Sequence, residues 1–280
     1  MSRYQDRLDN MVKGFNKEDL EQIQFTRDRI GIGTLERYTG SRSQDFQPYI
    51  LLTNFSRYVK VFSEIFEEPI HEGSVMSVCH SKKNRISIIN YTVGSPMAAL
   101  LMELLSFIKP KATLMLGMCG GLRKEFAVGS FFLPNAAIRD EGTSDSFMPR
   151  QCPALSSFVI HRYVCEELER RKLRYHNGVI HTTNVRFWEF KKEIRDILKK
   201  ERVQAIDMEC ATLFSVGFYY YVPVGALMLI SDLPLQPKGI KTSKSASAVF
   251  KNHARKHIEA GITCMQNMQK DEKRGFHYHF

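Results

Sequence analysis

The stretch "ALMLISDLPL", Ala226 to Leu235, is an aliphatic run that ends abruptly on Ser231 and Asp232. A short run without alternating polar residues is typical of a strand that is buried on both faces of a sheet. A second such run, "KATLMLGM" at 111–118, leads into the glycine pair Gly120 and Gly121. Strands of this kind need helices on both sides, so the two runs predict an α/β fold.

The remaining sequence alternates between strand and helix patterns, without an internal repeat or a long linker. A mostly parallel or mixed sheet in one α/β domain follows from this alternation. We expect a polar helical segment at 1–34, frayed at "GIGT" (31–34), a catalytic domain at 35–268 and a mobile tail at 269–280. The predicted strands are 49–53, 74–80, 84–91, 111–118, 130–138, 176–182, 204–207 and 224–231, and the predicted helices are 56–66, 96–108, 154–172, 189–202, 209–220 and 244–268.

Composition and charge argue against several classes of protein, including membrane, secreted and metal-binding proteins. The formal charge of +10 favours an anionic partner, but the basic residues alternate with acids and apolar residues, as in "KKEIRDILKKER", so nucleic acid is an unlikely main partner. No apolar run is long enough for a membrane span, and the N-terminus does not resemble a signal peptide. The six scattered cysteines predict reduced thiols in the cytoplasm. Neither HExxH nor a metal-ligand spacing occurs, so we expect no metal.

Four predicted strands end on residues that can hold a ligand. Arg57 follows the first strand, Gly94 precedes a helix, Gly120 and Gly121 follow the 111–118 run, and Asp232 ends the last strand. In open α/β sheets, ligands bind beyond the carboxyl ends of the strands. The sequence has no GxGxxG and no GxxxxGK[ST], which argues against a dinucleotide or P-loop site.

Each of the acidic residues also has a purely structural interpretation. Asp232 can cap Leu233 or its neighbours. Glu209, in "AIDMECATLF" (205–214), can occupy the first turn of a helix, and Asp207 can be its N-cap. The single tryptophan, Trp188, can belong to the core rather than stack on a ligand.

Taken together, the motifs "GSP" (94–96), "GMCGGLR" (117–123), "DMECAT" (207–212) and "ISDLP" (230–234) resemble the nucleoside phosphorylase family. Within that family they are most similar to the catalytic part of the bacterial AMP nucleosidases. Longer stretches, including "FQPYILLTNFSRYV", "GSFFLPNAAIRDEG" and "TTNVRFWE", carry the resemblance from Leu35 to Ile262. The long AMP nucleosidases have a further N-terminal regulatory domain, and we expect a form with only the catalytic domain here.

The resemblance implies one three-layer αβα domain with a mixed sheet. It also implies a homohexamer, built as a trimer of dimers, in which neighbouring subunits share active sites. The implied reaction, in purine salvage, is hydrolysis of the N-glycosidic bond of AMP to adenine and ribose 5-phosphate. No metal or organic cofactor is implied.

The resemblance also implies roles for particular residues. Asp232 would protonate the leaving base, which is worth about 10²–10⁴ in rate, and Glu209 would accept hydrogen bonds from the ribose 2′- and 3′-hydroxyls. The other residues implied to bind ribose or base are Met208, Trp188, Phe187, Gly94, Gly120, Gly121, Ser231 and Lys241.

Two departures bear on the nucleophile and the substrate. Phosphorylases bind phosphate through an arginine and a serine on the strand before the glycine turn, and the matching positions are Met115 and Met118, which favours water as the nucleophile. The residue that activates this water is not indicated. Arg37 would bind the 5′-phosphate from a neighbouring subunit, or it is simply a surface residue. Arg57 matches a phosphate-contacting arginine, and Arg123 and Arg186 are further candidates for the 5′-phosphate.

Two other functions stay open. The first is a purine nucleosidase or phosphorylase that acts on an unphosphorylated nucleoside. The second is a non-catalytic nucleotide- or RNA-binding protein, which the charge of +10 suggests.

Overall fold

The computed structural model describes residues 17–237 and 239–272. Its centre is a ten-stranded mixed sheet, as expected from the alternating apolar runs. The strands are β1 (Tyr49–Thr53), β2 (Ile70–Glu72), β3 (Ser77–Ser81), β4 (Ile86–Asn90), β5 (Ala112–Gly121), β6 (Phe131–Asp140), β7 (Ala154–Leu155), β8 (Tyr175–Thr183), β9 (Ala205–Asp207) and β10 (Val224–Asp232).

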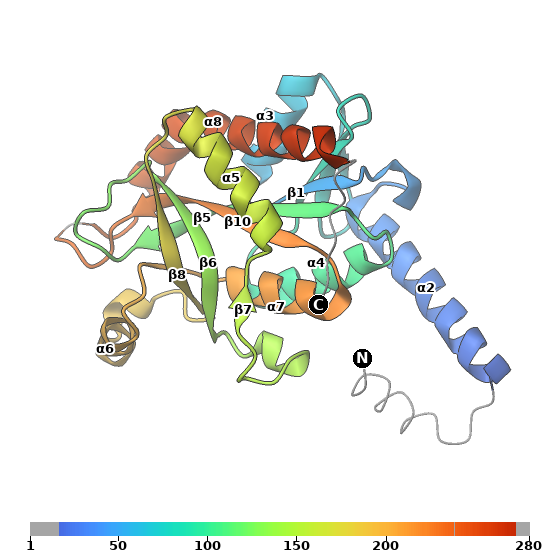
Figure 1. Ribbon diagram of the computed structural model, residues 1–280, viewed down its shortest axis with the longest axis horizontal. Helices are drawn as coiled ribbons and strands as arrows, with labels where there is room; N and C mark the ends of the chain where they lie inside the picture. Colours follow the sequence, from blue (N-terminus) through green and yellow to red (C-terminus); the bar gives the residue numbers. More distant parts are fainter. Residues whose placement is uncertain (1–16, 238, 273–280) are drawn as a thin grey trace.

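Helices cover both faces of this sheet, so the predicted three-layer arrangement is confirmed (Figure 1). On one face lie α3 (Ser56–Phe66), α5 (Phe158–Arg170) and α8 (Ser243–Lys270), and on the other lie α4 (Ser95–Ser106) and α7 (Cys210–Tyr220). The smaller elements are α6 (Lys192–Glu201) and the 3-10 helices η1 (Ser43–Asp45), η2 (Thr143–Ser146) and η3 (Trp188–Phe190).

The side chains of β5 show why the central strands are apolar throughout. Met115 and Cys119 belong to the core that contains α4 and α7, whereas Leu114, Leu116 and Met118 belong to the core that contains α3, α5 and α8. Successive residues of a strand point to opposite faces, so a strand between two helical layers needs apolar residues at every position.

Part of the sheet closes on itself. β10 pairs with β5 in parallel and with β6 in antiparallel orientation, and β6 continues through β8 and β9 back to β5. The other strands extend from β5 through β1, β4 and β3 to β2. Because the ring is closed, the ends of β5, β8, β9 and β10 lie around one common opening.

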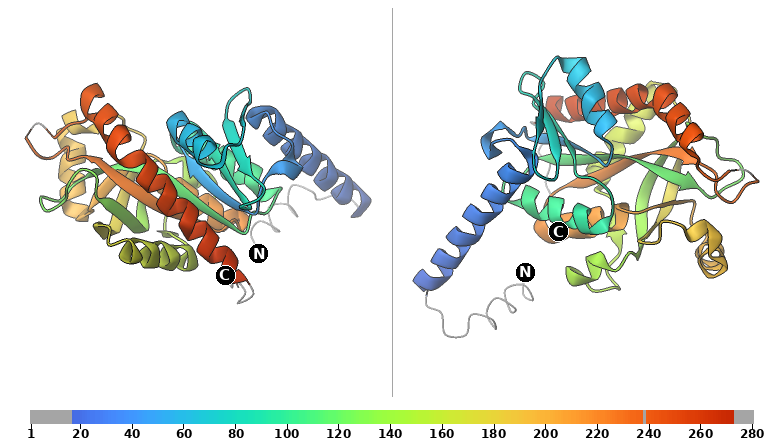
Figure 2. Two further views of the ribbon diagram at one scale, coloured as in Figure 1. Left: turned by 90° about the horizontal axis from the view of Figure 1, so that it is seen from above. Right: turned by 180° about the vertical axis from the view of Figure 1, so that it is seen from behind.

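The N-terminal helix α2 (Lys17–Thr39) corrects one expectation. Fraying at 31–34 was wrong, because α2 continues through these residues and Gly31 lies against the ring of Phe107, where a Cβ atom would come within 2.2 Å. The predicted domain boundary at residue 34 falls inside this helix, and Leu35 is buried in the core. The first turns of α2 project away from the body of the domain (Figure 2).

The chain termini are only partly described. Helix α8 ends at Lys270, within the segment expected to be a mobile tail, and 273–280 lie outside the described residues, as do 1–16 of the N-terminal segment. No helix within the described ranges is both long and apolar enough to cross a membrane.

Candidate functional site

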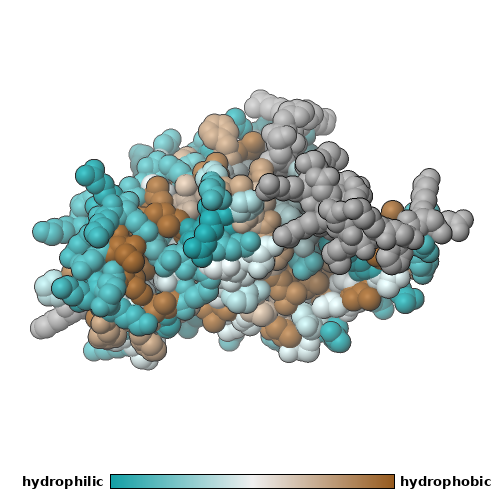
Figure 3. Space-filling view, turned by 90° about the horizontal axis from the view of Figure 1, so that it is seen from below, coloured by the Kyte–Doolittle hydropathy of each residue, from teal (hydrophilic) through white to brown (hydrophobic). Residues whose placement is uncertain are grey.

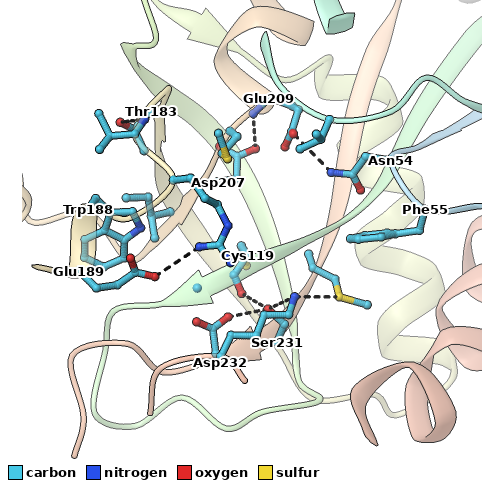
Figure 4. Close-up of a pocket in the computed structure, with 18 residues that line it drawn as sticks. Asn54, Phe55, Cys119, Thr183, Trp188, Glu189, Asp207, Glu209, Ser231 and Asp232 are labelled. Carbon is cyan, nitrogen blue, oxygen red and sulfur yellow. Dashed lines mark hydrogen bonds and ion pairs between the residues drawn. The ribbon is translucent and has the colours of Figure 1, made fainter. Parts of the chain in front are cut away.

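A pocket of about 260 Å³ opens where the central strands end (Figure 4). Its walls come from the carboxyl ends of β1, β5, β8, β9 and β10, from η3 and from the loop before α8. This is the edge at which open α/β sheets bind their ligands. The lining residues are Asn54, Phe55, Val93, Met118, Cys119, Gly120, Thr183, Val185, Arg186, Trp188, Glu189, Ile206, Asp207, Met208, Glu209, Ser231, Asp232 and Lys241.

Glu209 stands at the start of α7, with its side chain turned toward the pocket. Its Oε1 accepts hydrogen bonds from the backbone N–H of Gly94, at 2.8 Å, and from Nδ2 of Asn54, at 3.3 Å. Burial, reinforced by the nearby Asp207 carboxylate, raises the pKa of Glu209 to about 7. The helix dipole alone therefore does not explain the position of Glu209. Two other segments, at Asn54 and Gly94, hold its carboxyl group in the pocket.

Asp207 is the residue that holds Glu209 in place. Its Oδ2 accepts the backbone N–H groups of Cys210, at 2.7 Å, and Glu209, at 3.2 Å, and its Oδ1 accepts the hydroxyl of Thr182 at 2.6 Å. The expectation that Asp207 is the N-cap was wrong, because the N-cap of α7 is Glu209; Asp207 lies two residues earlier and still accepts N–H groups at the helix start. Burial raises the pKa of Asp207 as well, although these hydrogen bonds favour its charged form.

Asp232 ends β10 on another wall of the pocket (Figure 4). The hydroxyl of Ser231 donates to its Oδ1 at 2.6 Å, and burial raises its pKa. The backbone N–H of Leu233 donates to the carbonyl of Gly239 instead, so Asp232 does not cap it. A carboxyl group with a raised pKa is suited to donate a proton.

Lys241 is a partly buried cation beside this acid. Its Nζ donates to Oγ of Ser231 at 3.3 Å and lies 3.7 Å from Sδ of Met118. Burial lowers the pKa of Lys241, while the charge of Asp232 opposes that change. The sequence places Lys241 nine residues after Asp232, and only the loop between β10 and α8 brings it back to the pocket.

Two aromatic side chains line the pocket, Phe55 after β1 and Trp188 in η3. Of the two, only Trp188 was expected there from the sequence. Its side chain is buried against Leu198, Val203 and Ile206 and also lines the pocket, so the core and ligand-platform interpretations are both compatible with its position. Phe187 was expected beside the base, but it is 66% exposed and does not line the pocket. Its neighbour Arg186 does, with Nη1 at 3.7 Å from Oε1 of Glu189.

The other three arginines expected at the phosphate do not line the pocket of their own chain. Arg37 lies on α2, over the ring of Tyr38, and Arg123 donates to the backbone carbonyl of Arg202. Arg57 is exposed in the first turn of α3, two residues after the pocket residue Phe55. Arg186 is the candidate arginine that the fold places in the pocket.

The two glycine positions differ in their relation to the pocket. Gly120 lines it, whereas a Cβ on Gly121 would point to Leu233 and Ile230. Gly94 acts through its backbone N–H, which donates to Glu209. It has a φ of 97°, a conformation that favours glycine.

Sequence reasoning did not assign Asn54 or Glu189 to the site. Asn54 directly follows the first predicted strand, so its position was the available signal. Glu189 follows Trp188 in sequence, but nothing in the pattern shows that its carboxylate is buried. Within the described part of the chain, no cluster of three His, Cys, Asp or Glu side chains could hold a metal ion.

Comparisons with known proteins agree with this geometry. Residues 48–263 match the sequence model of the phosphorylase superfamily. The chain belongs to the phosphorylase superfamily.

Within the superfamily, the chain is similar to AMP nucleosidases. It is 27% identical to AMP nucleosidase of Escherichia coli K12 over 300 residues, which cover 91% of this chain but 62% of that protein. The chain thus spans about three-fifths of the length of this curated relative. The crystal structure of AMP nucleosidase from Bacteroides thetaiotaomicron superposes with a TM-score of 0.78 and 37% identity, covering 88% of this chain and 99% of that one.

Phosphorylases of the superfamily are more distant. The uridine phosphorylase of Vibrio fischeri has a TM-score of 0.71 at 20% identity, over 82% of this chain and 94% of its own, which shows the shared fold. The resemblance to AMP nucleosidases inferred from the sequence motifs is therefore confirmed, and so is the fold class.

The contacts of Asp207 predict how Glu209 titrates. We expect Asp207→Asn to lower the pKa of Glu209 from about 7, because it removes a neighbouring negative charge, but to leave it above the ordinary value of 4.5, because burial remains. NMR titration of ¹³C-labelled glutamate side chains, with Glu209→Gln to assign the signal, measures this shift. An unchanged or higher pKa in the Asp207→Asn protein would contradict the proposed coupling.

Proposed function

We propose that this protein hydrolyses the N-glycosidic bond of AMP to adenine and ribose 5-phosphate, as part of purine nucleotide salvage. The observation that carries the proposal is that the carboxyl groups of Glu209 and Asp232, each with a raised pKa, line one pocket. The similarity to AMP nucleosidases supports the choice of AMP. The two carboxyl groups are assigned different tasks because their surroundings differ.

Asp232 is the proposed general acid. Adenine leaves readily only as a neutral base, so a proton must reach N7 as the bond to the sugar breaks. Burial raises the pKa of Asp232 and so favours its protonated form, and the hydroxyl of Ser231 fixes the orientation of its carboxyl group. Lys241, which donates to the same hydroxyl, supports this arrangement.

Glu209 is the proposed ribose ligand. Its Oε1 is already held by Gly94 and Asn54, which orients the carboxyl group toward the pocket. In its ionised form it accepts hydrogen bonds from the 2′- and 3′-hydroxyls, and these strengthen as the sugar becomes cationic, as in glycosidases. Met208 lines the pocket beside it and packs against the sugar, while Trp188 provides the stacking surface for the base.

Water is the proposed nucleophile. Met118 lines the pocket with a thioether and Met115 is buried, with its Sδ accepting the hydroxyl of Tyr91 at 3.3 Å. Neither residue supplies a cation or a hydroxyl to bind an attacking phosphate at the positions where phosphorylases are expected to have them. The phosphate-dependent alternative, suggested by the phosphorylases in the superfamily, thus has less support.

The 5′-phosphate needs a cation, and three arginines remain candidates. Arg186 lines the pocket, Arg57 lies in the first turn of α3 close to Phe55, and Arg37 would have to come from a neighbouring subunit. Arg123 is a weaker candidate, because its guanidinium donates to the carbonyl of Arg202.

The proposed assembly is a homohexamer with shared active sites, in the cytoplasm and without a cofactor. Several large apolar side chains are exposed, among them Phe25, Phe158 and Phe190. Figure 3 shows separate hydrophobic patches on the face that carries α4 and α7. Patches of this kind are suited to contacts between subunits.

All six cysteines are free, in agreement with a reducing compartment.

Product analysis tests the reaction directly. We expect adenine release from AMP at the same rate with and without inorganic phosphate, and ribose 5-phosphate as the sugar product, because the pocket lacks the polar residues expected to bind phosphate. Chromatography of reactions with AMP, adenosine, IMP and GMP measures both products. Ribose 1,5-bisphosphate, formed only when phosphate is added, would show a phosphorylase instead.

Substitution of the two carboxyl groups tests their roles. We expect Asp232→Asn to lower kcat by about 10²–10⁴, because the amide keeps the shape but has no proton to transfer. Glu209→Gln should also be slow, because a neutral amide interacts less with hydroxyls on a cationic sugar. Thermal unfolding should differ little from that of the native protein. Near-native activity in either variant would refute the role assigned to that residue.

Three arginine variants identify the phosphate ligand. Loss of a charge-assisted hydrogen bond costs about 1.5–3 kcal/mol, so the correct Arg→Ala variant should lose roughly 10- to more than 100-fold in kcat/KM for AMP. Activity on adenosine should stay nearly unchanged in that variant. We expect this pattern in one or more of Arg37→Ala, Arg57→Ala and Arg186→Ala. An equal fall on both substrates would assign the arginine to the fold or the assembly.

A further inference from the structure

Glu189 is a buried carboxylate in the pocket to which neither the general acid nor the ribose role applies. Its side chain is 6% exposed, and it lines the pocket directly after Trp188 in η3. Oε1 faces Arg186 at 3.7 Å, beyond hydrogen-bond distance, and Oε2 is buried without a hydrogen-bond partner among the described residues. A buried acceptor without a donor is unfavourable. Oε2 has almost no accessible surface, so a donor from the ligand would reach this carboxyl group at Oε1, which is too far from Arg186 for a hydrogen bond.

Glu189 lies on the side of the pocket proposed to hold the base, away from the proposed ribose ligand Glu209. Trp188, the proposed stacking surface, is its neighbour, and Figure 4 shows both on the side of the pocket opposite Asn54. Glu209, the proposed ribose ligand, is tied to Asn54 and Gly94 on the other side. Arg186 interacts with both Glu189 and Asp232. Its Nη1 is 3.7 Å from Oε1 of Glu189, and its charge also acts on Asp232, where it favours the ionised carboxyl group.

The chemistry of purines indicates which group of the base can pair with Glu189. In adenine, N7 and the 6-amino group lie next to each other on one edge of the ring, so a base with N7 at Asp232 turns its 6-substituent toward the groups beside Asp232. An ionised carboxylate has only acceptors. It therefore accepts a hydrogen bond from an N–H of a 6-amino substituent and repels the carbonyl oxygen of a 6-oxopurine.

We infer that Glu189 is a specificity-determining residue that accepts a hydrogen bond from the 6-amino group of the purine and thereby selects adenine over hypoxanthine and guanine bases. Arg186, with Nη1 at 3.7 Å from Oε1, is the cation beside this carboxyl group at the pocket wall. The inference rests on the proposed function for the orientation of the base, and it names the feature of the substrate that this side of the pocket recognises.

Glu189→Gln tests the inference, since glutamine has the same shape but can turn an N–H donor toward a 6-oxo group. We expect kcat/KM for AMP to fall about 10-fold and the ratio of kcat/KM for AMP to that for IMP to fall on the order of 100-fold. Glu141→Gln is the matched control: Glu141 is also buried and its Oε2 also lacks a partner, but it lies outside the pocket. This control should keep the native AMP-to-IMP ratio. A native ratio in Glu189→Gln, or an equal change in both variants, would overturn the inference.

Binding of free bases to the native protein gives a second test that needs neither turnover nor a stable variant. Calorimetry should show adenine binding at least 10-fold more tightly than purine, which lacks a 6-substituent, and purine more tightly than hypoxanthine. Hypoxanthine or purine binding as tightly as adenine would reject the role of Glu189. If AMP is not hydrolysed but this order of affinities holds, the proposed function fails and the recognition of the 6-amino group stands.

Discussion

The buried carboxylate of Asp207 is the interaction on which the geometry of the site depends. It accepts two backbone N–H groups at the start of α7 and a hydroxyl from β8, and so joins strand, helix and the neighbouring Glu209 at one point. A buried carboxylate is costly unless donors surround it. Here the donors are the free N–H groups of a helix start, which need an acceptor in any case. The same charge acts on Glu209 and helps to raise its pKa.

The closed ring of strands brings the residues around Asp207 and the end of β10 into one pocket. Because β10 pairs with both β5 and β6, the ends of β5, β8, β9 and β10 surround one opening rather than lying along an open edge. Asp232 ends β10, and Glu209 stands between β9 and α7. The closed ring brings these two separate segments to the same pocket. Helices on both faces exclude water from the sheet, and the burial of the strand ends raises the pKa of both carboxyl groups.

The acidic groups of the pocket differ in what surrounds them, and the separate tasks proposed for them rest on this difference. Glu209 is held by an amide and a backbone N–H, Asp232 by a hydroxyl beside a buried lysine, and Glu189 by an arginine at a longer distance. Groups whose environments differ in this way can carry out proton transfer, sugar binding and base recognition within one small pocket. The apolar Met118 and Trp188 between them provide surface for a flat base.

The sequence by itself determined the layered α/β fold, because apolar runs such as 226–230 and 111–118 have only one favourable environment, a strand between two helical layers. It also indicated Asp232, Glu209 and the glycine pair 120–121, since these polar or flexible residues interrupt apolar segments. The two glycines continue β5 and pair with β9, so the turn expected there was wrong. Only the tertiary structure decided that the ring closes, that Arg186 lines the pocket of its own chain while Arg37 and Arg123 do not, and that Glu189 is buried with an unpaired oxygen. These features depend on contacts between residues far apart in the chain, and on side-chain directions that a local pattern does not specify.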